Sequence, residues 1–234
     1  MEGIGMQEDC FLQNWCNHLD CDKEFCARRY KMEAIYDLSL IPPKRRERMK
    51  LYTDADGTDL EEFKLLSSIE KSIERFVDSG QNLYLHSKMC GNGKTSWALR
   101  LAGDYINKIW PSSEICCRVL FVNVPNFLLD LKSNISRPVE SVNYIRDSVK
   151  TADLVIWDDI ASKVGSDYEI NNLLGLIEAR TSSGKANIYT SNLTRAELEA
   201  SLGSRIASRV CGLSVDVELH GADKRATSVE TKKC

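Results

Sequence analysis

The chain has 234 residues, 43% of them hydrophobic, and a formal net charge of −3. This length suits one sizeable α/β core with a small appendage, and the hydrophobic content is ordinary for a globular protein. The weak negative charge excludes attraction of nucleic acid through global charge. No apolar run approaches the roughly 18 residues of a membrane span, so we expect no membrane partner.

Residues 1–38 are rich in cysteine, aromatic and charged side chains. Residues 1–14 lack the apolar core that a signal peptide requires, so we expect a cytoplasmic protein. In a reducing compartment a dense cysteine cluster points to Zn²⁺ rather than to disulfides. The candidate zinc ligands are Cys10, Cys16, Cys21 and Cys26. Because they form no Cys-x-x-Cys pair, free cysteines packed among aromatic residues are the alternative.

Residues 39–60 have the composition of a connecting segment. They contain Pro42-Pro43, a basic run at 44–48 and the turn-forming sequence Asp-Ala-Asp-Gly at 54–57. We therefore expect three parts, which are an N-terminal region at 1–38, a linker at 39–60 and an α/β domain at 61–234.

Strands and helices alternate along the third part. Apolar residues at helical spacing predict a helix over 60–77, which Gly80 ends. The predicted strands are 83–86, 119–124, 154–157, 187–190 and 213–219. The predicted helices between them are 94–109, 125–131, 139–149, 170–180, 194–202 and 205–210. Continuous apolar strands that alternate with helices predict a parallel sheet covered by helices on both faces.

The first strand leads into Cys-Gly-Asn-Gly-Lys-Thr-Ser at 90–96, which has the chemistry of a phosphate-binding loop. Glycines at two positions let the backbone direct its N–H groups at phosphates. Lys94 can reach the β- and γ-phosphates, and the Thr95 hydroxyl can ligate Mg²⁺. The residues expected to bind ATP are Cys90, Gly91, Asn92, Gly93, Lys94, Thr95 and Ser96. The full pattern has glycine where this chain has Lys88.

Polar residues follow the third and fourth strands. Asp158 is expected to hold Mg²⁺ opposite Thr95, and Asp159 to orient the attacking water. The alternative for this pair is an acidic cap on a buried strand. The Asn192 amide can bond the water and the γ-phosphate, or instead serve as an N-cap or turn residue.

Arginines follow in the last part of the chain. Arg205 and Arg209 are one helical turn apart, and one of them can reach a nucleotide on a neighbouring subunit as an arginine finger. Arg225 offers another guanidinium after the last strand. The alternative for each is a solvated surface charge.

Five short motifs follow one another along the chain, in the order Gly-Asn-Gly-Lys-Thr, Asp-Asp-Ile, Thr-Ser-Asn-Leu, Gly-Ser-Arg-Ile-Ala-Ser-Arg and Gly-Ala-Asp-Lys-Arg. With these motifs in this order, the chain resembles the AAA+ ATPases of the DnaC/DnaI helicase-loader group, which includes IstB-type transposition helpers. The resemblance covers about residues 60–228, and the short form resembles phage and Gram-positive loaders. It implies an α/β P-loop NTPase with an AAA+ RecA-like parallel sheet, helices on both faces and a small Cys-rich N-terminal region. The implied roles are Walker A for Lys94 and Thr95, Walker B for Asp158 and Asp159, sensor 1 for Asn192, arginine finger for Arg209 with Arg205 beside it, and approximately sensor 2 for Arg225.

The resemblance further implies an ATPase that loads a replicative hexameric DNA helicase. Such a loader binds single-stranded DNA, forms a homo-oligomer when ATP is bound and hydrolyses ATP at subunit interfaces, while its N-terminal region binds the helicase. An IstB-like transposition helper is one alternative, although a helical DNA-binding arm is more typical of that class. A non-hydrolysing, nucleotide-dependent adaptor is another, on account of Asp159 and Lys88. The paired arginines disfavour a small-molecule kinase.

Overall fold

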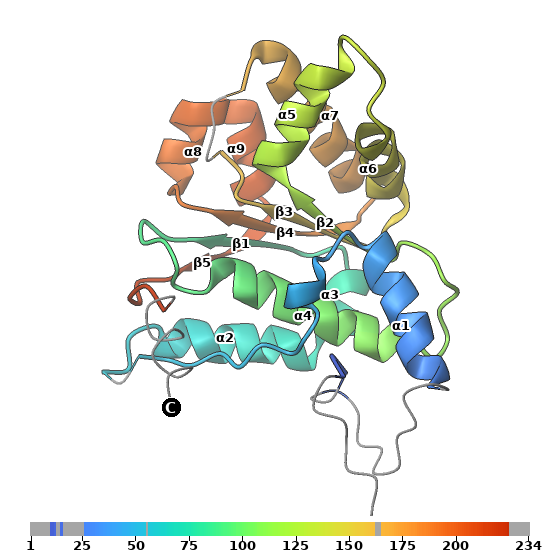
Figure 1. Ribbon diagram of the computed structural model, residues 1–234. Helices are drawn as coiled ribbons and strands as arrows, with labels where there is room; N and C mark the ends of the chain where they lie inside the picture. Colours follow the sequence, from blue (N-terminus) through green and yellow to red (C-terminus); the bar gives the residue numbers. More distant parts are fainter. Residues whose placement is uncertain (1–9, 13–14, 16–25, 55, 162–164, 225–234) are drawn as a thin grey trace, which may run out of the picture.

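The computed structural model describes residues 10–12, 15, 26–54, 56–161 and 165–224, and a parallel sheet lies at its centre (Figure 1). The sheet has five strands in the order β2-β3-β4-β1-β5, and every neighbouring pair is parallel. The strands are β1 (Asn82–His86), β2 (Val119–Asn123), β3 (Leu154–Asp158), β4 (Ala186–Ser191) and β5 (Ser214–Glu218). The predicted α/β class with a parallel sheet is confirmed.

Helices cover both faces of the sheet, which gives three layers (Figure 1). One face carries α5 (Val124–Asn134), α6 (Glu140–Thr151), α7 (Asp167–Ser182), α8 (Arg195–Leu202) and α9 (Ser204–Cys211). The other face carries α1 (Ala27–Leu38), α2 (Leu60–Lys71), α3 (Ile73–Asp78) and α4 (Lys94–Ile109). A short 3₁₀ helix, η2 (Pro43–Arg45), follows α1. Within the described residues, no helix combines the length and the apolar character that a bilayer crossing requires.

Side-chain alternation along the strands divides the core into two apolar clusters. In β1, Leu83 and Leu85 belong to the cluster under α1–α4, whereas Tyr84 belongs to the cluster under α5–α9. All three side chains are fully buried. A strand buried on both faces needs apolar residues at successive positions, which explains the continuous apolar runs in the sequence.

Helix α4 fixes the loop that precedes it to the sheet. It begins directly after Gly93, and its buried face includes Trp97, Leu101, Tyr105 and Ile106. Burying each of these large side chains contributes roughly 1.5–3 kcal/mol relative to leaving it in water. The first turn of α4 therefore has a rigid position under the carboxyl ends of β1, β3 and β4.

Two predicted elements differ from the structure. The helix predicted over 60–77 is two helices, α2 and α3, which meet at Ser72 with φ −113° and ψ 30°. The Ser72 hydroxyl donates to the Ser68 carbonyl oxygen (2.9 Å), a local bond that competes with helix continuation and that periodicity does not reveal. Helix α1 was not predicted, because cysteine and aromatic content dominated that segment.

Helix α1 and the segment after it pack on the α2–α4 side of the sheet. Met32, Ile35 and Tyr36 are buried in the same cluster as the residues of α4. The buried Arg46 guanidinium donates to the carbonyl oxygen of Ile41 (3.1 Å) and pairs with Asp37 (2.5 Å), which fixes the start of the connecting segment. The division of function among 1–38, 39–60 and 61–234 stays a prediction.

Candidate nucleotide-binding site

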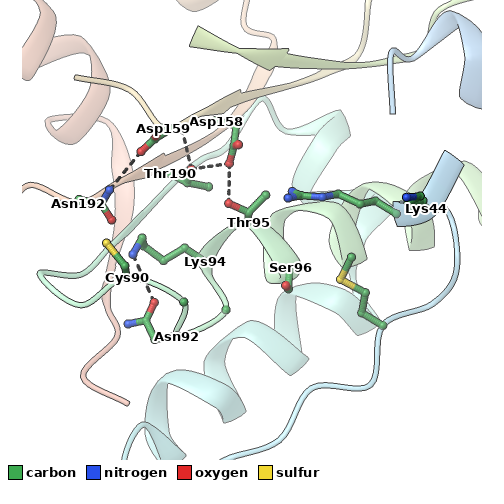
Figure 2. A pocket seen from close by; sticks show the side chains of 14 residues that line it. Lys44, Cys90, Asn92, Lys94, Thr95, Ser96, Asp158, Asp159, Thr190 and Asn192 are labelled. Carbon is green, nitrogen blue, oxygen red and sulfur yellow. Dashed lines mark hydrogen bonds between the residues drawn. The ribbon is translucent and has the colours of Figure 1, made fainter. Parts of the chain in front are cut away.

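A cavity of about 650 Å³ opens at the carboxyl ends of β1, β3 and β4 (Figure 2). This volume is in the range of small-molecule and cofactor sites. Its lining residues are Lys44, Arg45, Met49, Cys90, Gly91, Asn92, Gly93, Lys94, Thr95, Ser96, Asp158, Asp159, Thr190 and Asn192. The carboxyl edge of a parallel sheet is where ligands bind in folds of this kind. The structure thus brings together the predicted loop, the acidic pair and the amide.

The loop between β1 and α4 has the backbone that phosphate binding requires. Gly91 and Gly93 have φ values of +78° and +105°, in the left-handed region that glycine adopts without strain. The buried Asn92 amide donates to Ser87 Oγ (2.5 Å) and to the Leu219 carbonyl oxygen (3.0 Å). The loop is therefore fastened both to the end of β1 and to the segment after β5.

Lys94 extends its ammonium group across this loop. Nζ donates to the Met89 carbonyl oxygen (2.9 Å) and to Asn92 Oδ1 (3.3 Å). These neutral acceptors hold the positive charge at the mouth of the loop, beside the N-terminus of α4. Both features favour an anion at this point.

Asp158 lies at the centre of a hydrogen-bonded group of hydroxyls. Its Oδ1 accepts from Thr95 Oγ1 (2.7 Å) and from Thr190 Oγ1 (2.8 Å), and the side chain is 6% exposed. A carboxylate and a hydroxyl are the hard oxygen ligands that Mg²⁺ prefers. The donor set at Thr95 and Asp158 therefore fits Mg²⁺.

Asp159 has an unusual backbone that turns the chain at the end of β3. Its φ is +61°, a left-handed conformation that costs a non-glycine residue on the order of 1–2 kcal/mol. The Asp159 N–H donates to Thr190 Oγ1 (2.9 Å), and Asn192 Nδ2 donates to Asp159 Oδ1 (3.2 Å). The two side chains point toward one another across the cavity (Figure 2). The N-cap of α8 is Thr194 rather than Asn192, so the alternative interpretation of Asn192 as a cap is wrong.

Four lining residues were missed in the sequence. Thr190 is a threonine inside a strand, where that residue type is common. Lys44, Arg45 and Met49 come from the presumed linker and lie more than 40 positions before the loop. The basic run at 44–48 was the available signal, but spacing alone does not show which of its cations face a cavity.

The segment after β5 packs against the loop from the other side. Backbone N–H groups of His220 and Gly221 donate to the two Asp59 carboxylate oxygens (2.7 and 2.8 Å), and that of Ala222 donates to Asp54 (3.1 Å). The Lys224 N–H then donates to the Gly91 carbonyl oxygen (3.1 Å). A Cβ at position 91 would meet the Asp223 carboxylate, which would have to shift, and the φ of +78° adds strain for any residue other than glycine. We call residues 220–224 the C-terminal strap.

The α9 arginines lie apart from this cavity. Arg205 and Arg209 line a separate hollow of about 380 Å³, where Glu178 approaches their guanidinium nitrogens at 3.3 and 3.8 Å. Their side chains are 73% and 48% exposed. Neither guanidinium lines the cavity of its own chain, and the role of an arginine finger stays a prediction. Arg225 lies outside the described residues.

The zinc hypothesis also falls largely outside the described residues, since Cys16 and Cys21 are not among them. Cys10 is half-buried, and Cys26 Sγ accepts from the Arg29 N–H at 3.4 Å as the N-cap of α1. The described parts of the chain contain no cluster of three or more potential metal-ligating histidine, cysteine or acidic side chains. Zinc binding stays a prediction.

Comparison with known proteins gives structural matches only. No protein-family model matches the chain, and no curated protein matches it in sequence. A candidate primosome component from Streptococcus pyogenes serotype M3 is 25% identical with a TM-score of 0.61, and the match covers 82% of this chain and 98% of that one. The DnaC helicase loader is 15% identical with a TM-score of 0.60, and the match covers 76% of this chain and 100% of that one.

A third match is the replication initiator DnaA bound to AMPPCP and single-stranded DNA. It is 16% identical with a TM-score of 0.60. The match covers 83% of this chain and 55% of DnaA, so this chain spans about half the length of that protein. Together these structures confirm the AAA+ P-loop fold and the resemblance to the helicase-loader group.

Proposed function

We propose that this chain is an ATPase that loads a replicative hexameric DNA helicase. The observation that carries the proposal is the continuous set of contacts from Thr95 through Asp158 and Thr190 to Asp159 and Asn192, at the mouth of the phosphate loop. The fold neighbours, which include a helicase loader and an initiator bound to AMPPCP and DNA, support a role in replication.

ATP is proposed to bind with its phosphates along residues 90–96. Backbone N–H groups of the loop and the Lys94 ammonium group hold the phosphate oxygens, while Thr95 and Asp158 provide ligands for Mg²⁺. Mg²⁺ supplies charge neutralisation at those oxygens. Asp159 orients the attacking water and accepts its proton, and the Asn192 amide fixes that carboxylate.

Hydrolysis is proposed to require a second subunit. The exposed arginines of α9 are absent from the lining of their own cavity and are therefore free to approach the nucleotide of a neighbour. We therefore propose a homo-oligomer that forms when ATP is bound.

Single-stranded DNA is proposed to bind a groove between α6 and α7. This groove has a volume of about 470 Å³ and is lined by Arg146, Lys150, Tyr168, Asn171 and Asn172, among others. The Tyr168 side chain is 44% exposed. Cations track a phosphate backbone and an exposed aromatic ring stacks on bases, which is the combination that single-strand binding uses. The N-terminal region, residues 1–38, is proposed to bind the helicase.

The test is co-purification of the full chain with the replicative helicase of its source organism, with and without ATP. We expect the helicase to co-purify in the presence of ATP and Lys94→Ala to lose this dependence together with ATP binding. Lys64→Gln is the matched control for the loss of a positive charge. Lys64 lies on α2 (Figure 1), outside the lining of the nucleotide cavity, and pairs with Glu61.

Three results would contradict the proposal in different ways. Absence of helicase under every nucleotide condition would contradict loading. Helicase capture and ATP binding without turnover, even with DNA, would favour the adaptor alternative. If Tyr168→Ala and Lys150→Gln both leave the affinity for single-stranded DNA unchanged, DNA does not bind in the α6–α7 groove.

A further inference from the structure

The basic run at 44–48 divides into two pairs with different surroundings. Arg46 is buried and pairs with Asp37, and Arg48 pairs with Glu70 at 2.7 Å. Lys44 and Arg45 are exposed and line the cavity of the phosphate loop. Among the described residues, neither of these two side chains has a hydrogen bond or an ion pair. Two cations without partners in the described part of the chain therefore border a cavity whose loop suits an anion.

We propose that Lys44 and Arg45 bind the phosphate chain of the nucleotide, as a second cationic clamp beside Lys94. This inference rests on the proposed function, namely that the cavity binds a nucleoside triphosphate. It assigns to the connecting segment a direct role in ligand binding, which its composition alone does not indicate.

The charge of the cavity supports this assignment. Its charged lining residues are Lys44, Arg45, Lys94, Asp158 and Asp159. With Lys94 as the sole cation, the lining would carry one positive and two negative charges, a net of −1 that repels phosphate. With Lys44 and Arg45 the count is three positive and two negative, a net of +1. These two residues thus reverse the sign of the lining charge that an incoming polyphosphate meets.

The backbone that carries the two cations is firmly held. The Arg45 N–H donates to the Pro42 carbonyl oxygen (2.8 Å) and the Arg46 N–H to that of Pro43 (3.3 Å), which forms the turn of η2. Arg46 then anchors this turn to the buried Ile41 through the carbonyl oxygen of that residue. The cations therefore project from a fixed turn, and binding has to order only their side chains.

The position of Lys44 indicates which part of the phosphate chain it contacts. Figure 2 shows Lys44 and Asn192 at opposite ends of the view, with Thr95 and Ser96 between them. The γ-phosphate belongs beside Asp159 and Asn192, where the attacking water is oriented. Lys44 is therefore assigned to oxygens of the phosphates nearer the nucleoside, which ADP also has.

The experiment measures Mg²⁺-dependent binding of ATP, ADP and inorganic tripolyphosphate to the full chain by calorimetry. The variants are Lys44→Gln, Arg45→Gln and the double substitution. Lys50→Gln is the matched control, because Lys50 is an exposed cation of the same segment outside the cavity lining. Partly exposed ion pairs are each worth up to about 1 kcal/mol, or roughly fivefold in affinity, so the double variant should lose about tenfold and at most about 25-fold.

The expected pattern is specific to phosphate binding. Affinity for all three probes falls, the loss shrinks at high salt, and Lys44→Arg with Arg45→Lys restores binding. KM for ATP rises while kcat at saturation stays within about twofold, because these contacts exist in both the ground and transition states. Thermal melting of each variant should match that of the wild type.

Several outcomes would overturn this inference alone. These are wild-type affinity of the double variant for all probes, loss for ATP and ADP without loss for tripolyphosphate, or an equal loss in Lys50→Gln. Failure of the wild type to bind ATP, or unchanged binding in Lys94→Ala, would instead overturn the proposed function together with this inference.

Discussion

The Thr190 hydroxyl lies 2.8 Å from Asp158 Oδ1 and 2.9 Å from the backbone nitrogen of Asp159. One side chain on β4 therefore fixes the position of both acidic residues that end β3. It donates to the Asp158 carboxylate and accepts from the Asp159 N–H, so both of its hydrogen-bonding functions are used. Because Thr190 is 1% exposed, water cannot replace it at either contact.

Thr190→Val is expected to slow ATP hydrolysis about tenfold while weakening ATP affinity by less than threefold. Valine keeps the volume but leaves the Asp159 N–H without its acceptor, which costs about 1–3 kcal/mol of folding stability. Steady-state turnover, ATP titration and urea unfolding measure the three effects. Thr181→Val is the control, since the Thr181 hydroxyl donates only to the Ile177 carbonyl within α7. Full turnover in Thr190→Val would show that the acidic pair needs no support from β4.

Asp159→Asn is expected to keep ATP affinity within about twofold and to lower kcat on the order of 100-fold or more. Asparagine can still contact Asn192, but it cannot accept a proton from the attacking water. ATP binding by calorimetry and phosphate release by a continuous assay separate the two effects. A comparable loss of affinity and turnover would instead place Asp159 among the Mg²⁺ ligands.

Arg209→Ala is expected to bind ATP normally and to lose DNA-stimulated hydrolysis by about 10³-fold, because we propose that its guanidinium acts on the nucleotide of a neighbour. Mixing it with Lys94→Ala should restore part of the activity, since some interfaces then combine an intact loop with an intact arginine. A titration of one variant into the other measures this recovery. No recovery at any ratio, together with full activity of dilute wild-type monomer, would make Arg209 a surface charge.

The stability of the protein should fall as pH rises toward 8. Burial, followed by the neighbouring Glu70, raises the pKa of the Asp104 carboxyl from 3.8 to about 8. Between those values the folded protein keeps a proton that the unfolded chain has lost, so the free energy of unfolding decreases with increasing pH. Burial raises the pKa of Glu70, but a hydrogen bond with Asp104 and then the contacts of Arg100 and Arg48 outweigh it and hold the pKa below 4.5, so Glu70 affects stability only below the tested window.

Urea unfolding between pH 5.5 and 8 measures this dependence. Asp104→Asn cannot titrate and should flatten the profile, whereas Asp147→Asn, a change at an exposed carboxylate, should leave it as in the wild type. An identical slope in Asp104→Asn and wild type would show that another group carries the proton.

The sequence predicted the sheet well, because fully buried strands need continuous apolar runs and the helices between them need helical periodicity. It also identified Asp158, Asp159 and Asn192, since the ends of parallel strands meet at one edge. The sequence did not predict the surroundings of side chains that depend on contacts between residues far apart in the chain. Nothing in the run at 44–48 indicates that Arg46 and Arg48 pair with acidic residues elsewhere while their neighbours face a cavity. The break between α2 and α3 at Ser72 was not predicted for the opposite reason, because it depends on a single local hydroxyl contact.

The C-terminal strap has a consequence for synthesis of the chain. Strand β1 pairs with β4 and β5, and Asn82 finds its partner Asn187 105 positions later, while Asp59 meets His220 across 161 positions. A nascent chain that has reached β3 therefore has a central strand with neither of its neighbours, and such long-range closure folds slowly. Both edges of β1 stay open to wrong partners until β4 and β5 have been translated, and the loop at Gly91 lacks its outer wall until the strap follows, so the candidate nucleotide site is among the last parts of the molecule to mature.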